Sequence, residues 1–419
     1  MFMVRTARLV TRSNRISGSY TNFIRAISVA KDTNSLLVNW DQLKGVWSRF
    51  HYQWLRDNCA CPKCCYPDTG QRILRMQEDA RPNSVITDNE RVEISWKDGH
   101  NSQYKHSWLL ENSYYHNNIA NIKPSDTTTQ RSDIVLWDAG YFKSRQPPSV
   151  EYEEYMNSDE GLLKMLRQFR RYGLCFIHNT PASEEATFDV VRRVGPLRRT
   201  YYGDVWSMVA GNMSVGDIAY WSGLVDLHTD NIFLTEAPGL LAFHCIECEF
   251  TGGESLFIDG FCVADHIHQT QPDHFQLLSK VSLPFQMQFK DALYQTRKRF
   301  FQPNHEGQII ETNYNYIDRQ PIDNRAMSDM QAVLDCDPDK AISTFYKAMD
   351  YLHSLLYGSQ FAYEIKLLPG ACLLFDNHRL LHGRKPLTGH RKLCGSSVNR
   401  EEWESKLKTL ERQAQNNSG

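Results

Sequence analysis

The sequence contains no long uninterrupted apolar run. No stretch approaches the roughly 20 residues that a helix needs to cross a bilayer, so we expect no membrane partner. Charge of one sign is not in excess either, because 47 Lys and Arg residues are offset by 49 Asp and Glu residues, giving a formal net charge of −2. This balance gives no reason to expect nucleic acid as a partner.

The first 31 residues lack acidic side chains. They contain five arginines and several serines, and the first acid in the chain is Asp32. An arginine-rich, serine-rich and acid-free segment is typical of a mitochondrial transit peptide. We therefore predict a removable leader at residues 1–31 and a location in the mitochondrial matrix. A basic tail without a targeting role is the alternative.

A disulfide framework is not expected, because the eleven cysteines are odd in number and a matrix location is reducing. Seven of them lie mostly in apolar runs. The other four fall in "CACPKCC", residues 59–65, where Cys59, Cys61 and Cys64 form a C-x-C-x2-C array. Three thiolates this close can bind one tetrahedral zinc ion, which takes four soft or borderline ligands.

The fourth zinc ligand is Cys65 or His100, the last residue of "WKDGH". We favour His100, because the side chains of the adjacent residues Cys64 and Cys65 point in divergent directions. A closed four-ligand site is structural, and a small β module with a thin core would gain stability from it. Reactive or incidental thiols are the alternative interpretation.

The chain divides into a β-rich N-terminal domain at 32–118, a polar connector at 119–150 and a larger domain at 151–419. Short strands with turns are predicted over 35–115. In the larger domain we expect a helix over 158–173, a second over 337–358, and a hairpin across the glycines of "TGG", residues 251–253. Strands predominate without regular βαβ alternation, which favours an antiparallel sandwich or barrel.

The stretch "VDLHTDNIFL", residues 225–234, has the pattern of a buried strand with His228 and Asp230 on one face. Both side chains are costly to bury unless they pair or share a cation. Two imidazoles and one carboxylate can hold Fe(II) and leave positions open. Candidates for the second histidine are His244, His378, His382 and His390. We favour His382, since Gly383 follows it and Arg391 could bind a carboxylate shortly after.

Four segments, "LHTDN", "FHCIECEFTGGESLFIDGF", "LLFDNHRLLHGR" and "HRKLCG", together resemble the 2-oxoglutarate-dependent oxygenases of carnitine biosynthesis. "WLRDNCACPKCC" with "SWKDGH" resembles their N-terminal zinc-binding module. The resemblance implies a mainly β protein with helices, in which a double-stranded β-helix (jelly roll) forms the catalytic domain. It also implies Fe(II), structural zinc, ascorbate and 2-oxoglutarate as cosubstrate. Carried over by position, it implies His228, Asp230 and His382 as iron ligands, and Arg391 and Ser255 as contacts of 2-oxoglutarate.

Substrates of that family carry a trimethylammonium group, which aromatic faces bind well. The resemblance places Tyr202, Trp206 and Tyr220 where the family builds an aromatic cage. Ser397 stands where the family pattern has another tyrosine. The cage is therefore three-sided, or is completed by Tyr201 or Trp221.

Three features resemble the trimethyllysine enzymes and favour trimethyllysine over γ-butyrobetaine as the small-molecule substrate: Asp217, the mitochondrial type of leader, and "LCG" after Arg391. Asp217, where γ-butyrobetaine enzymes carry asparagine, would attract the α-ammonium of trimethyllysine, and Asn315 matches a substrate-contacting asparagine. The complete C-x-C-x2-C array resembles the γ-butyrobetaine enzymes instead. We expect hydroxylation of free trimethyllysine at C3 by a homodimer. Alternatives are hydroxylation of γ-butyrobetaine or another quaternary amine, or a non-catalytic trimethylammonium-binding protein.

Overall fold

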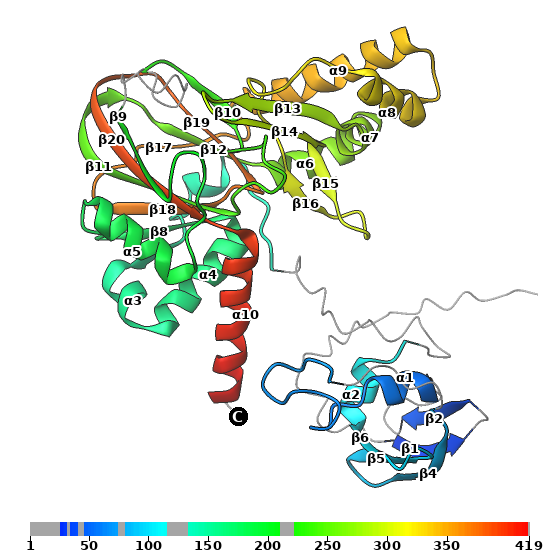
Figure 1. Ribbon diagram of the computed structural model, residues 1–419. Helices are drawn as coiled ribbons and strands as arrows, with labels where there is room; N and C mark the ends of the chain where they lie inside the picture. Colours follow the sequence, from blue (N-terminus) through cyan, green and yellow to red (C-terminus); the bar gives the residue numbers. More distant parts are fainter. Residues whose placement is uncertain are drawn as a thin grey trace, which may run out of the picture. The chain divides into compact units, whose positions relative to one another are not determined.

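The chain folds into two compact units, residues 1–130 and residues 131–419. A computed structural model describes residues 26–31, 34–40, 46–73, 80–114, 133–209 and 222–417 (Figure 1). Within these ranges no helix combines the length and the apolar character that crossing a membrane requires.

The described residues of the N-terminal unit form two three-stranded antiparallel sheets and two short helices. One sheet has the order β1 (Ala26–Lys31), β2 (Ser35–Trp40) and β3 (Trp47–His51), and the other has β4 (Pro82–Thr87), β5 (Arg91–Trp96) and β6 (Asn101–Lys105). Alternate residues of β2 and β5 enter one buried cluster, as expected for strands with one solvated face.

Two features of this unit differ from the sequence-based expectations. The sequence predicts short strands and turns over 35–115, but two segments of this range form short helices, α1 (Tyr52–Asp57) and α2 (His106–Glu111). In addition, the predicted leader at 1–31 includes β1, which pairs with β2 through backbone hydrogen bonds.

The second unit is built on two sheets that pack face to face. The larger sheet has the order β7 (Ser149–Glu151), β8 (Leu174–His178), β18 (Ala371–Asp376), β11 (Leu240–Gly252), β20 (Leu387–Val398) and β9 (Val205–Val209). The smaller sheet has the order β10 (Val225–His228), β19 (Leu380–Arg384), β12 (Ser255–Asp259) and β17 (Tyr363–Ile365). All pairs are antiparallel except β7 with β8, so the predicted antiparallel sandwich is confirmed.

Alternation along the strands fills the space between the sheets. Leu241 and Phe243 of β11 contribute to the cluster that includes Phe257 of β12, whereas Leu240 and Ala242 face the opposite side. On that outer side lie α3 (Tyr152–Asn157), α4 (Asp159–Tyr172), α5 (Glu184–Val194) and α10 (Arg400–Asn417) (Figure 1). The larger sheet thus has two apolar faces, one packed against the smaller sheet and the other against these helices.

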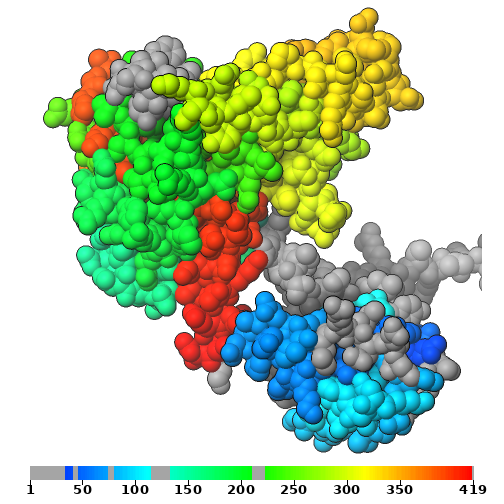
Figure 2. All heavy atoms as spheres, in the orientation of Figure 1, coloured from blue at the N-terminus to red at the C-terminus, as the bar shows by residue number. Residues whose placement is uncertain are grey.

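Helices also cover the outer side of the smaller sheet. They are α6 (Gly260–Thr270), α7 (Pro272–Lys280), α8 (Asn324–Leu334) and α9 (Pro338–Leu356), and they share a core with Ile258 and Leu381. The hairpins β13 (Leu283–Gln288) with β14 (Leu293–Lys298), and β15 (Phe301–Pro303) with β16 (Ile309–Thr312), join this layer. In Figure 2 the yellow and orange segment containing α8 and α9 forms a lobe beside the sandwich.

The two helices predicted in the second unit, over 158–173 and 337–358, are present. Ser158 accepts a hydrogen bond from the amide of Gly161 at the start of α4, and Gly173 ends that helix with a left-handed φ of 76°. Asp337 caps α9 in the same way.

The predicted hairpin across residues 251–253 is wrong. β11 belongs to the larger sheet and β12 to the smaller one, so the chain crosses between sheets at these glycines. Gly252 has a φ of 74°, and a Cβ on it would lie 2.6 Å from the carbonyl oxygen of Pro386. The glycines therefore permit a close crossing rather than a tight turn within one sheet.

Residues 133–150, which the sequence suggests as a connector, pack within the second unit. The short 3-10 helix η3 (Tyr141–Lys143) lies in this stretch. Trp137 is buried, and its amide donates to Asp259 Oδ2 at 3.2 Å. Asp259 also forms a fully buried ion pair with Arg379, whose Nη2 donates to the carbonyl of Val135. This stretch is therefore fixed to the strands of the sandwich.

Candidate active site

His228 and His382 are cross-strand neighbours. β10 pairs antiparallel with β19, and the register places these two residues directly opposite each other, with ring centroids 4.3 Å apart. Phe257 of β12 lies opposite His382 on its other side. The sheet register alone therefore brings together two imidazoles that are far apart in the sequence.

Asp230 joins the histidines by a different route from the one expected. The strand predicted over 225–234 ends at His228, and the following residues form turns. Asn231 adopts a left-handed φ of 55°, which turns the chain back immediately after the acid. The carboxylate thus reaches the histidines because the chain turns, and not because residues i and i+2 share a strand face.

The three side chains converge. Asp230 Oδ1 lies 3.0 Å from His228 Nε2 and 3.7 Å from His382 Nε2. His228 Nδ1 donates to the carbonyl of Asp226 at 2.7 Å, which leaves the lone pair of Nε2 directed at the centre. We call His228, Asp230 and His382 the triad; one ligand atom from each lies within 4.8 Å of the others.

The protonation equilibria of His382 and Asp230 favour binding of a cation. Those of His228 oppose it, because burial, which lowers the pKa of its imidazole, is outweighed by the hydrogen bond and charge of Asp230, which raise it. Burial, together with the charge of His228, lowers the pKa of His382 to about 3. Burial opposes ionisation of Asp230, but the charge and hydrogen bonding of the histidines outweigh it and lower the pKa of this carboxyl. A neutral imidazole and an ionised carboxylate are the states in which these groups bind metal. Two imidazoles and one carboxylate fit Fe(II).

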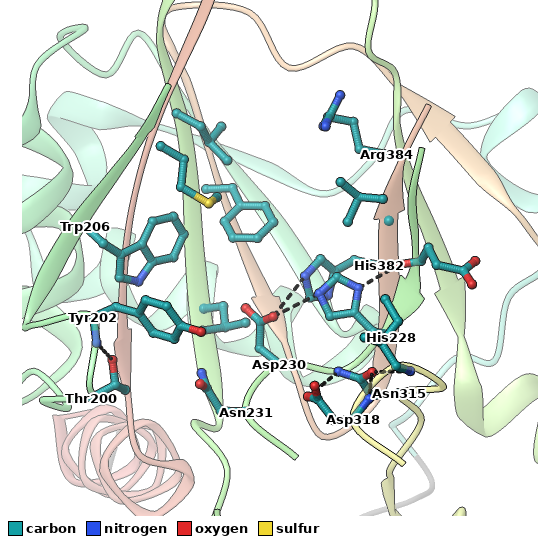
Figure 3. A pocket seen from close by; sticks show the side chains of 18 of the residues that line it. Thr200, Tyr202, Trp206, His228, Asp230, Asn231, Asn315, Asp318, His382 and Arg384 are labelled. Atoms are coloured by element: carbon teal, nitrogen blue, oxygen red, sulfur yellow. Dashed lines mark hydrogen bonds and ion pairs between the residues drawn. The ribbon is translucent and has the colours of Figure 1, made fainter. Parts of the chain in front are cut away.

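The triad opens into a cavity of about 480 Å³. Eight of the residues predicted for iron, cosubstrate or substrate binding line it: Tyr202, Trp206, His228, Asp230, Ser255, Asn315, His382 and Arg391. Figure 3 shows Tyr202 and Trp206 to the left of the triad, and Asn315 and Asp318 below His228. A cavity of this size, lined by both apolar and polar side chains, suits a small ligand.

Two guanidinium groups reach the cavity. Arg391 is buried, and its Nε has no hydrogen-bond partner within the described ranges. Burial and the nearby charge of Arg391 lower the pKa of Arg384 to about 10. Ser255, opposite Arg384 in the β12–β19 register, brings a hydroxyl to the same region. Two like charges in a buried place favour an anionic ligand.

An aromatic wall forms on the other side of the triad. Trp206 in β9 lies opposite Gly395 in β20, and a Cβ on Gly395 would overlap the indole ring. Ser397 also lines the cavity. Tyr201 instead stacks on Phe289 at a centroid distance of 3.7 Å, and it does not contribute to the described cavity lining. Asp217, Tyr220 and Trp221 lie outside the described residues.

Carboxylates line the wall beside His228. The Asn315 amide donates to Asp318 Oδ2 at 2.8 Å, and a backbone bridge pairs Asn315 with His228. Asp226 also faces the cavity and accepts a hydrogen bond from Tyr357. This side is therefore polar and anionic, in contrast to the aromatic wall.

Three charged residues of the described cavity lining were not predicted from the sequence: Asp226, Asp318 and Arg384. For two of them a signal was present. Asp226 stands two residues before His228 in β10, and Arg384 two residues after His382 in β19, so each shares a face with its histidine. Asp318 follows β16 in a turn, where no periodicity points to it.

The other candidate histidines have different partners. His244 bonds Thr187 through Nδ1 at 2.8 Å, His378 Nε2 donates to the carbonyl of Ala237, and His390 pairs with Glu247. The structure therefore brings only His382, of the four candidates, to His228 and Asp230 among the described residues.

The cysteine array forms a second cluster, in the N-terminal unit. The sulfur atoms of Cys59, Cys61 and Cys64 lie 3.3, 3.6 and 3.6 Å from His100 Nε2. Ligands about 2.0–2.3 Å from a tetrahedral zinc ion are separated by about 3.5 Å, so the donor set fits. The thiol of Cys65 instead donates to the carbonyl of Cys59.

Arg56 and Asp98 link the two segments that carry this cluster. Arg56 Nη1 lies 3.5 Å from Cys64 Sγ, and its Nε and Nη2 donate to Asp98 Oδ2. Asp98 Oδ1 in turn accepts from the amide of His100 at 2.9 Å. A guanidinium here would offset the excess negative charge of three thiolates around one zinc ion.

Comparison with known proteins identifies the family. Residues 139–397 match the model described as "Taurine catabolism dioxygenase TauD, TfdA family". The chain belongs to the TauD/TfdA dioxygenase family. Residues 27–110 match the model "Gamma-butyrobetaine hydroxylase-like, N-terminal", so both units of this TauD/TfdA dioxygenase have a family counterpart.

Individual relatives span nearly the whole chain. Mitochondrial trimethyllysine dioxygenase of Mus musculus is 33% identical over 373 residues, which cover 86% of this chain and 82% of the relative. Trimethyllysine dioxygenase of Meyerozyma guilliermondii is 28% identical, covering 92% of this chain and 96% of the relative. Gamma-butyrobetaine dioxygenase of Homo sapiens is 28% identical, covering 79% and 82%.

Proposed function

We propose that this TauD/TfdA dioxygenase hydroxylates free N6,N6,N6-trimethyl-L-lysine at C3, the first step of carnitine biosynthesis. The observation that carries the proposal is the arrangement of the cavity around the triad, with aromatic rings on one side and carboxylates beside His228. The trimethyllysine dioxygenases among its relatives support the same substrate.

The triad would hold Fe(II), and the arginine side of the cavity would hold 2-oxoglutarate. Bound iron supplies the O2 chemistry by which one oxygen atom enters succinate as CO2 leaves, and the other enters a C–H bond. Arg391 would bind the distal carboxylate of the cosubstrate, with Ser255 and Arg384 beside it. The protein groups orient both ligands and exclude water. A need for ascorbate stays a prediction.

The substrate would lie across the triad. Its trimethylammonium group cannot donate hydrogen bonds, so the faces of Tyr202 and Trp206 are suitable partners. C3 is the carbon next to the α-carbon, so the α-ammonium must lie close to the metal. Asp318 and Asp226, on the wall beside His228, would attract it.

γ-Butyrobetaine dioxygenase activity is the second candidate. It is favoured by the human relative and by the N-terminal family match. This substrate has a carboxylate and no ammonium at the end opposite its trimethylammonium, so the carboxylates that attract trimethyllysine would repel it.

One experiment distinguishes the candidates. The purified protein is incubated with Fe(II), 2-oxoglutarate, ascorbate and either betaine, and succinate and hydroxylated product are measured by mass spectrometry. We expect product from trimethyllysine; succinate formed only with γ-butyrobetaine would support the second candidate. A His228→Ala variant should lose turnover, whereas in a protein that only binds trimethylammonium groups, function would survive this change.

We infer a mitochondrial matrix location, supported by the arginine-rich start of the chain and by mitochondrial relatives such as the mouse protein. Cleavage before residue 26 would retain β1 in its sheet. The mass of the mature protein from mitochondria tests this.

We also infer that the second unit is a double-stranded β-helix, supported by its two antiparallel sheets and by strands that alternate between them. The N-terminal cluster would bind structural zinc. The homodimer stays a prediction, which size-exclusion chromatography with and without a chelator can test.

A further inference from the structure

Asn377 contacts the backbone of Asp230 on both sides of that residue. Its Oδ1 accepts from the amide of Asp230 at 2.7 Å, and its Nδ2 donates to the carbonyl of Asp230 at 3.0 Å. The same Nδ2 donates to the carbonyl of Pro238 at 3.0 Å. Reversing the amide would place its oxygen against two carbonyls, so the bonds define one orientation. The side chain is 1% exposed and all its hydrogen-bonding groups are used.

These bonds act where the chain turns sharply. Asp230 is followed by Asn231 in the left-handed region, a conformation that costs free energy for a residue other than glycine. On the other side of Asp230, the amide of Thr229 donates to the carbonyl of Tyr314 at 2.7 Å. Two neighbouring residues are therefore held by separate segments, and the carboxylate has little freedom to move away from the histidines.

Asn377 also belongs to the segment that carries the third ligand. It lies in the turn between β18, which ends at Asp376, and β19, which contains His382. Its own amide donates to the carbonyl of Gly239 at 2.9 Å. The turn before His382 is thus joined directly to the turn that contains Asp230.

We propose that Asn377 is a positioning residue that sets the distance between Asp230 and His382, and so the affinity of the triad for its metal. This inference rests on the proposed metal centre. Groups that hydrogen-bond to metal ligands typically change the affinity for the metal by roughly 10–100-fold. Asn377 would act through the backbone of a ligand rather than through its carboxylate, and it is not part of the described cavity lining.

The test is a titration of zinc-loaded, iron-free protein with Mn(II), followed by the EPR signal of free Mn(II). Manganese prefers oxygen and imidazole ligands to thiolates, so it should report the triad and not the cysteine cluster. Wild type is compared with Asn377→Ala and Asn377→Asp. Asn313→Ala is the matched control, because Asn313 is also buried and its Nδ2 donates to the carbonyl of Arg299.

We expect Mn(II) to bind about 10–100-fold more weakly to both Asn377 variants, and within about threefold of wild type to the control. The melting temperature of the metal-free proteins is measured in parallel. Equal losses of stability in Asn377→Ala and Asn313→Ala, with an unchanged Mn(II) dissociation constant, would overturn the proposal. If Asn377→Ala does not fold, Asn377→Ser, whose hydroxyl can still form a hydrogen bond, takes its place in the same comparison of Mn(II) affinity and melting temperature.

His228→Ala separates this inference from the proposed function. Loss of Mn(II) binding in that variant with retention in Asn377→Ala would refute only the positioning role. Unchanged binding in His228→Ala would refute the metal centre itself.

Discussion

His228 and His382 face each other across the β10–β19 pair, with ring centroids 4.3 Å apart. Their proximity is a property of strand register, so a shift of one residue would turn one ring to the other face of the sheet. The turn before β19, which is anchored on the 230–239 segment by Asn377, opposes such a shift.

His382→Ala should remove a proposed metal ligand while leaving a small side chain in the strand. We expect loss of 2-oxoglutarate turnover on the order of 100-fold or more, measured as succinate formed. His390→Ala is the control, since His390 is half exposed and pairs with Glu247. Comparable turnover in both variants would contradict the assignment.

Arg391→Met should raise the KM for 2-oxoglutarate about 10–100-fold, because a buried bidentate partner of the distal carboxylate is lost. Arg391→Lys should have a KM for 2-oxoglutarate nearly as high as that of Arg391→Met, since an ammonium cannot form the two parallel hydrogen bonds. The measurement is succinate formation against cosubstrate concentration at saturating trimethyllysine. A KM that stays at the wild-type value in Arg391→Met would assign the carboxylate to Arg384.

Asp318→Asn tests the anionic wall. Removing the charge without changing the size should raise the KM for trimethyllysine roughly tenfold, which corresponds to about 1.4 kcal/mol. Turnover of γ-butyrobetaine should stay constant or rise, because repulsion of its carboxylate is reduced. Asp226→Asn gives the matched comparison. If neither variant changes the ratio of the two activities, these carboxylates do not select the substrate.

Arg56→Met should accelerate the loss of zinc from the cysteine cluster. Arg56 contacts Cys64 and is held by Asp98, so we expect transfer of zinc to a chelating dye to become about 10–100-fold faster. Arg72→Met is the control, because Arg72 is exposed and pairs only with groups outside the cluster, such as Asp57. Equal rates in the two variants would argue against a role for the guanidinium.

His244 should make the fold sensitive to acid. Burial lowers its pKa from 6.5 to about 4 in the folded protein. Between these values the unfolded chain binds more protons, so stability is complete above pH 6.5 and falls as the pH drops toward 4, by up to about 3 kcal/mol. In His244→Gln the free energy of unfolding should depend less on pH, which urea unfolding at pH 7, 5.5 and 4 would measure. A pH dependence like that of wild type would exclude His244 as its source.

Sequence reasoning was most successful where residue type and local spacing determine the outcome. The helices over 158–173 and 337–358 followed from local rules, and they are present as α4 and α9. The choice of His382 among four histidines used only its neighbours Gly383 and Arg391, and the structure brings it to His228.

The errors arose where long-range packing decides. Nothing in "VDLHTDNIFL" shows that Asn231 is left-handed. The two residues before it are held by distant segments, Asp230 by Asn377 and Thr229 by Tyr314. Similarly, the glycines after β11 are compatible with a hairpin or with a crossing between sheets. Only the position of Pro386 against Gly252 distinguishes the two.

The missing side chain at Gly395 has a consequence for altering the enzyme. The indole of Trp206 rests on bare backbone there, so the single hydrogen atom of Gly395 sets how closely the ring lies against β20, and with it the width of the proposed trimethylammonium recess. A methyl group at this position would push the ring inward and narrow the recess. The cavity would then bind smaller amines in preference to bulky ones. A substitution at residue 395 alone would therefore change the substrate selectivity.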